Sequence, residues 1–396
     1  MRISSVDVIP ISIPLRAPIR WPWGCRVEAC RTVVRLRTDD GLVGYGETIG
    51  GDTVAILQAN AGRVQGEDPF NIERILARYL MTPYFSGYAG YGAICGIEMA
   101  CWDLMGRATG RSVSDLLGGR YRERVEVSAY IFARYEKDGE GGEDSPDRLT
   151  GFCRRMAMEH GFKVFKYKGG VFDPDFDVAT LRSMREALGP SARLRIDPNG
   201  NWSFETALRL SRQFAEIGLE YLEDPVWGLD CMARLRKDVP IPFATNMCVV
   251  DMDTLPVGIR LGAVDIVLGD PHKWGGLWQT KKLAAVCQAF GLGMSIHSGA
   301  EAGISTAANL HLAASTPQIY LAIDSHYHHL SDDILAGGML CYVDGQMEVP
   351  AGPGLGVTVD EDRLALYAER FRRQGDSVFA GKDVHRPQWF PQRPAW

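Results

Sequence analysis

The segment Leu194–Asn199, which reads LRIDPN, is the first of several short apolar runs that end in a polar side chain of a chemically useful type. Asp197 ends this run. Later runs end in the same way, after intervals of 26, 23 and 24 residues and once more at a similar distance, at Glu223, Asn246, Asp270 and His297. A strand and a helix that repeat at this interval are the unit of a (β/α) barrel. Since the carboxyl ends of barrel strands meet at one mouth, these side chains are predicted to lie together.

Three of these residues form a set of oxygen donors. Asp197, Glu223 and Asn246 offer only oxygen atoms, with a combined charge of −2. Such a set suits Mg²⁺, or Mn²⁺, with water and substrate oxygens completing the shell, and it disfavours Zn²⁺. Any one of them could simply mark the end of a strand and the start of a loop, as Asp-Pro often does. Their spacing at consecutive strand ends favours a metal site.

Two lysines are predicted to enter the same mouth. Lys166 and Lys168 lie two apart on a predicted strand, 162–168, and side chains at that spacing share a face. Two enclosed ammonium groups need anions beside them. Their mutual repulsion and a nearby divalent cation are expected to lower the pKa of a lysine toward that of a usable base. For the lysines alone, a solvated basic strand is an equally good interpretation.

A second base is predicted from an aspartate and a histidine at neighbouring strand ends. If Asp270 accepts a hydrogen bond from one ring nitrogen of His297, it orients the imidazole and raises its basicity. Asp324 and His326 follow the last predicted strand, 319–324, and are candidates for hydrogen bonds to substrate. The other loop histidines are interpreted as ordinary hydrogen-bonded side chains: His272, His328, His329 and His385.

The first third of the chain has a different pattern. Residues 1–14 alternate between apolar and polar, and the runs 32–37 and 42–46 flank Asp39-Asp40-Gly41, a hairpin signature. Helical stretches follow near 52–64, 71–81 and 91–108. An antiparallel sheet with helices at one end is an α+β domain.

From Val125 onward, strands and helices alternate. The sequence therefore predicts an α/β fold: a modified (β/α)7β TIM barrel with an α+β N-terminal capping domain. Ser203 and Gly218 mark the two ends of one barrel helix, 204–217. We expect a capping domain over residues 1–122, a catalytic barrel over 123–349 and a C-terminal segment, 350–396, that packs back on the capping domain.

The composition is typical of a cytoplasmic enzyme subunit with a large core. The chain has 396 residues, of which 46% are hydrophobic and 23% charged, and a net charge of −6 without a basic run. These values disfavour nucleic acid and membranes as partners, and no apolar stretch reaches the length of a membrane span. Nine cysteines without a Cys-x-x-Cys pair indicate reduced, buried thiols. We expect a homo-oligomer.

The motifs in combination resemble the enolase superfamily, and within it the glucarate dehydratase group. The stretch Gly96–Arg107 is similar to the capping domain of that superfamily, which has a fold like that of mandelate racemase and muconate lactonizing enzyme. An Asn as the third metal ligand is distinctive of the glucarate dehydratase group. The motifs that carry the resemblance are Lys166-x-Lys168, Asp197-Pro-Asn-Gly, Glu223-Asp-Pro, Asn246 and the Asp270/His297 pair.

The resemblance implies a role for each residue. Lys168 would be one base, with Lys166 beside it binding the substrate carboxylate. His297, oriented by Asp270, would serve the opposite face of the substrate. The metal would be Mg²⁺, and the residues in contact with substrate would be Asn199, Asp324, His326 and Trp23.

Two stretches depart from the pattern of glucarate dehydratases. Glu301 and Gly299 follow the catalytic histidine where those enzymes carry asparagines, and the loop Arg16–Gly24, which should cap the pocket, lacks their Asn and His residues. These departures concern the substrate and leave the core chemistry unchanged.

The implied activity is that of an acid-sugar dehydratase acting on a small carboxylate such as an aldarate. It would remove the proton α to a carboxylate and expel the β-hydroxyl as water, which gives a 2-keto-3-deoxy acid. The alternative on the same scaffold is a racemase or epimerase of a 2-hydroxy acid. A non-catalytic metabolite-binding protein would not need two bases, and a Schiff-base aldolase using Lys168 would not depend on the metal.

Overall fold

The computed structural model describes residues 1–376, 383 and 385–396. An antiparallel sheet near the N-terminus is built from β1 (Ile3–Trp21), β2 (Gly24–Thr38) and β3 (Val43–Ile49), with the short β5 (Ala133–Arg134) at the edge beside β1. The hairpin predicted around residues 39–41 is confirmed, because β2 and β3 pair antiparallel across it.

The first strand is longer than predicted. The segment expected to form a capping loop, Arg16–Gly24, is mostly strand, because Ile19 to Trp21 pair with Gly24 to Arg26 in the same ladder as the rest of β1 and β2. Only Pro22 and Trp23 form the turn between the two strands. The loop is therefore a rigid hairpin tip.

Helices cover one side of this sheet: α1 (Asp52–Asn60), the 3₁₀ helix η1 (Ala61–Val64), α2 (Ile72–Arg78), α3 (Met81–Thr109) and α4 (Val113–Leu116). The predicted helix 91–108 is the last part of α3, which begins ten residues earlier and contains a kink at Gly87 (φ 53°, ψ −132°). Residues 92–106 are buried throughout, as expected for a helix that is apolar on most sides. Together the sheet and helices form the cap.

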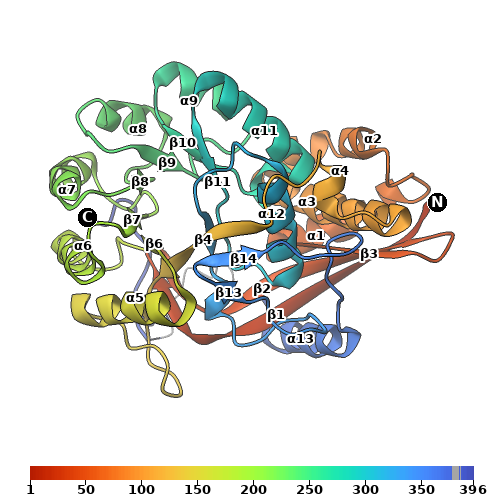
Figure 1. The fold of residues 1–396 in the computed structure, drawn as a ribbon, viewed down its shortest axis with the longest axis horizontal. Coiled ribbons are helices and arrows are strands. Elements are labelled where there is room, and N and C mark those ends of the chain that lie inside the picture. Colours follow the sequence, from red (N-terminus) through yellow and green to blue (C-terminus); the bar gives the residue numbers. More distant parts are fainter. Residues whose placement is uncertain (377–382, 384) are drawn as a thin grey trace.

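Eight parallel strands form the barrel, and helices surround them (Figure 1). Neighbouring strands pair in the order β11-β10-β9-β8-β7-β6-β4, with β12 on the other side of β4. Between β11 and β12 the structure has an isolated bridge from Met294 to Ile319 and a hydrogen bond from the Asp324 amide to the Ile296 carbonyl. The strands are β4 (Arg124–Ile131), β6 (Val164–Tyr167), β7 (Arg193–Ile196), β8 (Tyr221–Glu223), β9 (Phe243–Thr245), β10 (Ile266–Leu268), β11 (Gly293–Ser295) and β12 (Ile323–Ser325).

The barrel helices follow the strands in turn: α5 (Pro146–His160), α6 (Pro174–Leu188), α7 (Phe204–Ile217), α8 (Leu229–Arg236), α9 (Thr254–Leu261), α10 (Pro271–Trp274), α11 (Leu277–Phe290) and α12 (Gly303–Ser315). The predicted bounds of α7 are confirmed, with Ser203 accepting from the Thr206 amide and Gly218 in the left-handed conformation. The last strand was predicted at 319–324, but β12 lies four residues later, because Ile319 makes only the isolated bridge and Tyr320 is exposed.

The C-terminal part of the chain touches both the cap and the barrel. After η2 (Tyr327–His329), the hairpin β13 (Tyr342–Val343) and β14 (Gln346–Glu348) extends the barrel sheet beside β4. The helix α13 (Glu361–Gln374) lies on the cap, where Arg370 donates to Glu28 at 2.8 Å. The last residues instead reach the barrel, since the Trp396 indole donates to the Gly170 carbonyl at 3.4 Å.

A buried carboxylate, Glu98, joins cap and barrel. Glu98 on α3 accepts hydrogen bonds from the Leu277 and Trp278 amides, both at 2.9 Å, which are the first free amides of α11. The indole of Trp102 donates to the same carboxylate at 2.6 Å. Burial raises the pKa of Glu98 to about 7, although these hydrogen bonds lower it. A side chain of the capping domain thus satisfies the free backbone amides at the N-terminal end of the barrel helix α11.

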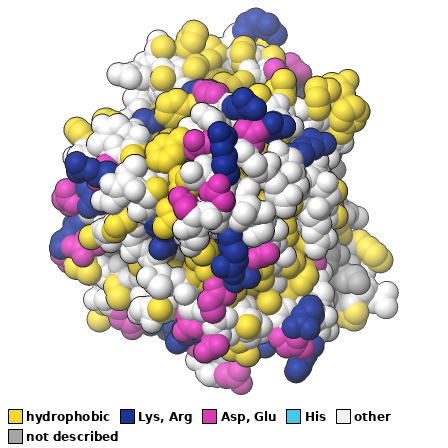
Figure 2. Space-filling model, turned by 90° about the vertical axis from the view of Figure 1, so that its right-hand side faces the viewer, with side chains coloured by type: hydrophobic (Ala, Val, Ile, Leu, Met, Phe, Trp, Pro, Cys, Tyr) yellow, Lys and Arg dark blue, Asp and Glu magenta, His cyan; other side chains and the backbone are white. Residues whose placement is uncertain are grey.

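The surface carries mixed charge. On the face shown in Figure 2, basic and acidic side chains are interspersed with hydrophobic ones, in keeping with a net charge of −6. Six of the nine cysteines are buried as expected, two are half-buried, and Cys341 is exposed where burial was expected. Among the described residues, no helix is long and apolar enough to cross a membrane.

The packing of α3 on β3 gives a stability prediction. A methyl group on Gly46 would lie 2.0 Å from the Gly96 carbonyl oxygen and 2.8 Å from the Ala100 amide, so Gly46→Ala must push the helix off the sheet. We expect the free energy of unfolding to fall by about 1–3 kcal/mol. Gly151→Ala is the control, because Gly151 is an exposed residue of α5 with open space around it. That change should stabilise by about 0.5–1 kcal/mol. Chemical denaturation measures both; equal effects would contradict the packing argument.

Candidate active site

The carboxyl ends of the barrel strands bring together the side chains that the sequence singled out. All are buried except His297, which is slightly exposed. Each one lies in or directly after a strand between β6 and β12. The group consists of Lys166, Lys168, Asp197, Asn199, Glu223, Asn246, Asp270, His297, Asp324 and His326.

Asp197 is the anion that compensates Lys168. The Lys168 ammonium donates to the Asp197 carboxylate at 2.5 Å, and the Asn199 amide donates to its other oxygen at 2.7 Å. Burial acts to raise the pKa of Asp197, but Lys168 and Lys166 outweigh it, and the pKa lies below its usual value. Asp197 is therefore a carboxylate at neutral pH.

Lys166 lies between two carboxylates. Its ammonium is paired with Glu223 and, at 2.6 Å, with Asp324. Burial acts to lower the pKa of Lys166, but these two anions raise it well above its usual value. The expected lowering of the lysine pKa is therefore wrong for Lys166, because the sequence did not reveal that Asp324 points inward. A permanent ammonium is suited to binding a carboxylate and unsuited to removing a proton.

Asp324 is fully engaged by the protein. Besides Lys166, it accepts from the Ser128 hydroxyl at 2.8 Å and from Arg195 at 3.3 Å. Its pKa lies below the usual value, since Lys166 and Arg195 outweigh burial. Asp324 therefore holds Lys166 in place, and its contact with substrate stays a prediction.

The three prospective metal ligands are adjacent. The Asn246 carboxamide donates to Glu223 at 2.5 Å and accepts from the Lys273 ammonium at 2.8 Å. A half-turn of that carboxamide would exchange its oxygen and nitrogen and bring the oxygen beside Glu223. Burial and the charge of Asp197 raise the pKa of Glu223 well above its usual value.

The donor set fits a hard divalent cation. Each of the three residues already attracts an ammonium group: Lys168 on Asp197, Lys166 on Glu223 and Lys273 on Asn246. Among the described residues, the side-chain oxygen of Asn199 is a buried acceptor without a hydrogen-bond partner. Two carboxylates and a carboxamide with an unsatisfied oxygen nearby are the donors that Mg²⁺ prefers.

Sequence reasoning missed Lys273 and Tyr88. The Lys273 ammonium also donates to the Asn246 carbonyl at 3.1 Å, and the Tyr88 hydroxyl, from α3 of the cap, donates to that carbonyl at 3.0 Å. Burial lowers the pKa of Lys273, although Asp270 and Asp224 raise it. The available signal was the position of Lys273 one helical turn after Asp270. The cap thus reaches Asn246, one of the prospective metal ligands, directly.

A chain of hydrogen bonds runs from the cap to the predicted histidine base. Glu47 on β3 accepts from Arg31 on β2 at 2.7 Å, and the Arg31 guanidinium reaches the His272 Nε2 atom at 3.0 Å. His272 Nδ1 lies 2.8 Å from one oxygen of Asp270, and His297 Nδ1 lies 3.0 Å from the other. His272, interpreted from sequence as an ordinary loop histidine, is a link in this chain.

The direction of these hydrogen bonds fixes the tautomer of each histidine. A guanidinium can only donate, so His272 Nε2 accepts and its Nδ1 carries the proton that Asp270 accepts. The carboxylate then accepts from His297 Nδ1 as well, which leaves Nε2 of His297 with a free lone pair. Burial and Lys273 lower the pKa of His297 to about 3, although Asp270 raises it. His297 is a neutral base.

A second cluster of possible metal ligands is filled by a side chain of the protein. Asp270, His272 and Glu301 have ligand atoms within 4.8 Å of one another. The Arg31 guanidinium bonds to His272 and interacts with the charges of Glu301 and Asp270, which together with Glu47 raise its pKa in spite of burial. Arg31 supplies the positive charge that this cluster requires.

The hairpin tip of the cap forms a wall beside the mouth. Trp23 packs on Trp21 at a ring-centroid distance of 5.4 Å and on Trp227, which follows β8, at 5.7 Å. Pro22 lies close enough to Gly170 that a methyl group there would contact it at 3.3 Å. Trp23 therefore seals the cap against barrel loops.

Two more groups lie on the opposite side of the mouth. His326 follows β12 and its Nδ1 lies 2.8 Å from the Ser298 hydroxyl. Arg26, on β2 of the cap, donates to the Gly299 carbonyl at 3.4 Å. Sequence reasoning missed Arg26, whose distance along the chain gave no signal of this approach.

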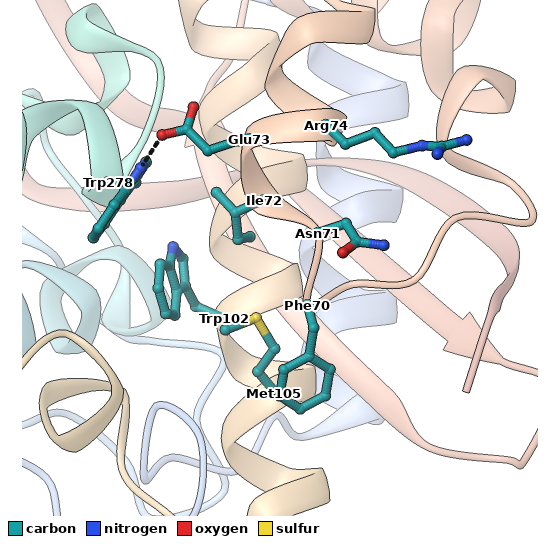
Figure 3. A pocket seen from close by; sticks show the side chains of 8 residues that line it. All are labelled: Phe70, Asn71, Ile72, Glu73, Arg74, Trp102, Met105 and Trp278. Atoms are coloured by element: carbon teal, nitrogen blue, oxygen red, sulfur yellow. Dashed lines mark hydrogen bonds between the residues drawn. The ribbon is translucent and has the colours of Figure 1, made fainter.

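Another hollow, of about 410 Å³, lies away from the mouth between α2, α3 and α11 (Figure 3). Trp278 donates there to Glu73 at 2.7 Å, and Trp102 lines the same hollow. The predicted bases do not line it, so we place the chemistry at the barrel mouth.

The chain is similar to known proteins over nearly its whole length. Residues 3–118 match the mandelate racemase/muconate lactonizing enzyme N-terminal domain, and residues 148–363 match the enolase C-terminal domain-like family. A probable glucarate dehydratase of Streptomyces coelicolor is 36% identical, with 92% of each chain covered. A D-galactarolactone cycloisomerase of Agrobacterium fabrum is 32% identical, with coverage of 85% of this chain and 90% of that one.

The solved structures agree with the sequence relatives. A Pseudomonas fluorescens enolase crystallised with magnesium, potassium and tartrate superimposes with a TM-score of 0.93 at 33% identity, covering 100% of this chain and 99% of that one. Together with the matched domains, these similarities show that the chain belongs to the enolase superfamily, with the N- and C-terminal domains of the mandelate racemase/muconate lactonizing enzyme type.

Proposed function

We propose that this protein is a Mg²⁺-dependent acid-sugar dehydratase that acts on an aldarate. The observation that carries the proposal is the pairing of two candidate bases with one oxygen-donor set. Lys168 follows β6 and His297 follows β11, with four strands between them on one side of the barrel and two on the other. The prospective ligands Asp197, Glu223 and Asn246 end the strands between the two bases.

The chemistry requires stabilisation of negative charge. Loss of a proton α to a carboxylate gives an enediolate dianion, and a divalent ion bound by the three ligands would stabilise that charge by several kcal/mol. The Lys166 ammonium, held by Glu223 and Asp324, is suited to binding the same carboxylate. Active sites of this superfamily use a Lys or His base together with Mg²⁺.

The two bases divide the proton transfers. Lys168 accepts the α-proton on one face of the substrate, while neutral His297 faces the other. In dehydration, His297 takes up a proton from solvent at Nε2 and delivers it to the departing β-hydroxyl, which leaves as water, while Lys168 later returns the α-proton to solvent. Asp270 stabilises the imidazolium that forms in this step, because its carboxylate accepts from Nδ1 at 3.0 Å.

An aldarate has two carboxylates, and the mouth has cations for both. Lys166 serves the reacting end, while Arg26 lies on the other side beside Gly299. The charge of Arg26 lies close enough to lower the pKa of His326, after burial as the larger cause. The relative named as a probable glucarate dehydratase and the neighbour with bound tartrate, a diacid, support this substrate class.

Epimerisation of a 2-hydroxy acid is the second candidate. The opposed bases favour it, because a proton removed by one and returned by the other inverts the α-carbon. The cycloisomerase among the relatives shows that the scaffold supports other outcomes. Whether water leaves depends on a β-hydroxyl placed near His297.

The direct test is a screen of acid sugars for a 2-keto product. We expect turnover of at least one aldarate with Mg²⁺ and none in excess chelator, because the enediolate then lacks its cation. Glu223→Ala should abolish turnover, and Glu348→Gln, an exposed control on β14, should not change it. Full activity in chelator, or no aldarate among the substrates, would overturn the proposal.

Deuterium exchange tests the two-base assignment. For a pair of substrate epimers at the α-carbon, His297→Asn should stop exchange of one epimer and spare exchange of the other through Lys168. Lys168→Ala should show the reverse. Loss of a general base typically costs about 10²–10⁴-fold, which proton NMR in deuterated water detects. Equal loss for both epimers in both variants would show that one residue is only structural.

The pKa of His297 gives a pH prediction. Its folded pKa of about 3 lies below the ordinary value of 6.5, so the folded state binds fewer protons between these values. The contribution of His297 to stability is therefore complete above pH 6.5 and is lost as the pH falls toward 3. Lys273 lowers this pKa, so Lys273→Met should raise it, as an NMR titration of the ligand-free protein would show. Lys282→Met, on the outer face of α11, is the matched control. An unchanged pKa in Lys273→Met would contradict the assignment.

A further inference from the structure

Glu301 is a buried carboxylate to which the proposed mechanism gives no role. It is 4% exposed and lies in the loop between β11 and α12. One oxygen accepts from the Ser298 hydroxyl and the other from the Gly299 amide, both at 2.5 Å. Because Gly299 occupies one oxygen through its backbone, the second oxygen is directed at Ser298.

The Ser298 hydroxyl transmits this constraint to His326. A hydroxyl has one proton, and here that proton goes to the Glu301 carboxylate. The hydroxyl oxygen then has only lone pairs to offer His326, whose backbone amide donates to it at 3.1 Å and whose Nδ1 lies 2.8 Å away. His326 Nδ1 must therefore carry the ring proton, and Nε2 must carry the lone pair.

The free nitrogen belongs to a ring at the carboxyl end of β12. The ring is held against Tyr130 and Phe132, at centroid distances of 4.1 and 5.1 Å. Within the described part of the chain, Nε2 has no hydrogen-bond partner. The surrounding protein does not fully enclose this atom. Burial, followed by the charges of Arg26, His329, Lys168 and His297, lowers the pKa of His326 well below its usual value, so the ring stays neutral.

We propose that Glu301 is a positioning residue which, through Ser298, fixes the Nδ1–H tautomer of His326, so that Nε2 accepts a hydrogen bond from a substrate hydroxyl. Lys166 and Arg26 can only donate, and they attract carboxylate and oxo groups without distinction. A lone pair fixed among these donors rejects an oxo or carboxylate oxygen and accepts a hydroxyl. The site thereby selects a hydroxylated carbon chain in one orientation.

The tautomer can be tested without any substrate. In ligand-free protein labelled with ¹⁵N-histidine, His326 should show a protonated Nδ1 and a bare Nε2, with its signals identified by their loss in His326→Gln. In Glu301→Gln the amide donates to Ser298, the hydroxyl proton turns to His326 Nδ1, and the two nitrogen signals should exchange character. Glu301→Asp keeps the carboxylate and should keep the wild-type tautomer. Glu348→Gln, exposed on β14, is the matched control and should leave the spectrum unchanged.

A kinetic readout follows from the same change. The selection of a hydroxylated substrate rests on the proposed function, whereas the tautomer does not. For the acid sugar turned over by the wild type, Glu301→Gln should raise KM by about threefold to tenfold, as expected for one lost hydrogen bond, with a smaller effect on kcat. It should also weaken the preference for that substrate over its oxo analogue.

The outcomes separate the two ideas. A bare Nδ1 in the wild type, or identical spectra for the wild type and Glu301→Gln, would overturn the role of Glu301 even if an aldarate is dehydrated. The predicted spectra combined with no turnover of any acid sugar would support the tautomer and overturn the proposed function.

Discussion

The compensation of buried charge at the barrel mouth is the constraint on which the site depends. Lys166 is fully enclosed, and an isolated ammonium in such a place would be strongly destabilising. Glu223 and Asp324 offset that cost, and Asp197 does the same for Lys168. Each anion is thus both a counterion and a prospective catalytic group. Removal of Asp197 takes this carboxylate from Lys168, and removal of Glu223 or Asp324 leaves Lys166 with one of its two, so substitutions at these strand ends affect stability as well as chemistry.

The second organising feature is the direction of hydrogen bonds. Arg31 can only donate, and this single fact sets the proton on His272, the acceptor state of Asp270 and the free lone pair of His297. Arg31 and its counterion Glu47 belong to the cap, whereas His297 belongs to the barrel. The state of the predicted base is therefore set by the neighbouring domain.

The sequence predicts the barrel and the residues at its strand ends because one spacing places Asp197, Glu223 and Asn246 on successive strands. Side chains that reach the site without this spacing leave no such signal in the sequence. Lys273, Arg26 and the carboxylate of Asp324 reach their positions through the packing of cap on barrel and through side-chain direction, which spacing does not encode. The hairpin tip was mistaken for a loop because its Pro and Trp residues hide the pairing with β2.

The joint at Glu98 has a consequence for movement between cap and barrel. Its carboxylate closes the first turn of α11, so a cap that moved away as a rigid body would leave the Leu277 and Trp278 amides without their acceptor. Hydrogen bonds at the start of a barrel helix thus hold the capping domain against the barrel. The contact between Trp23 and Trp227 is of another kind, since it joins cap and barrel through aromatic packing alone, and parting these two rings would cost packing and no hydrogen bond between them.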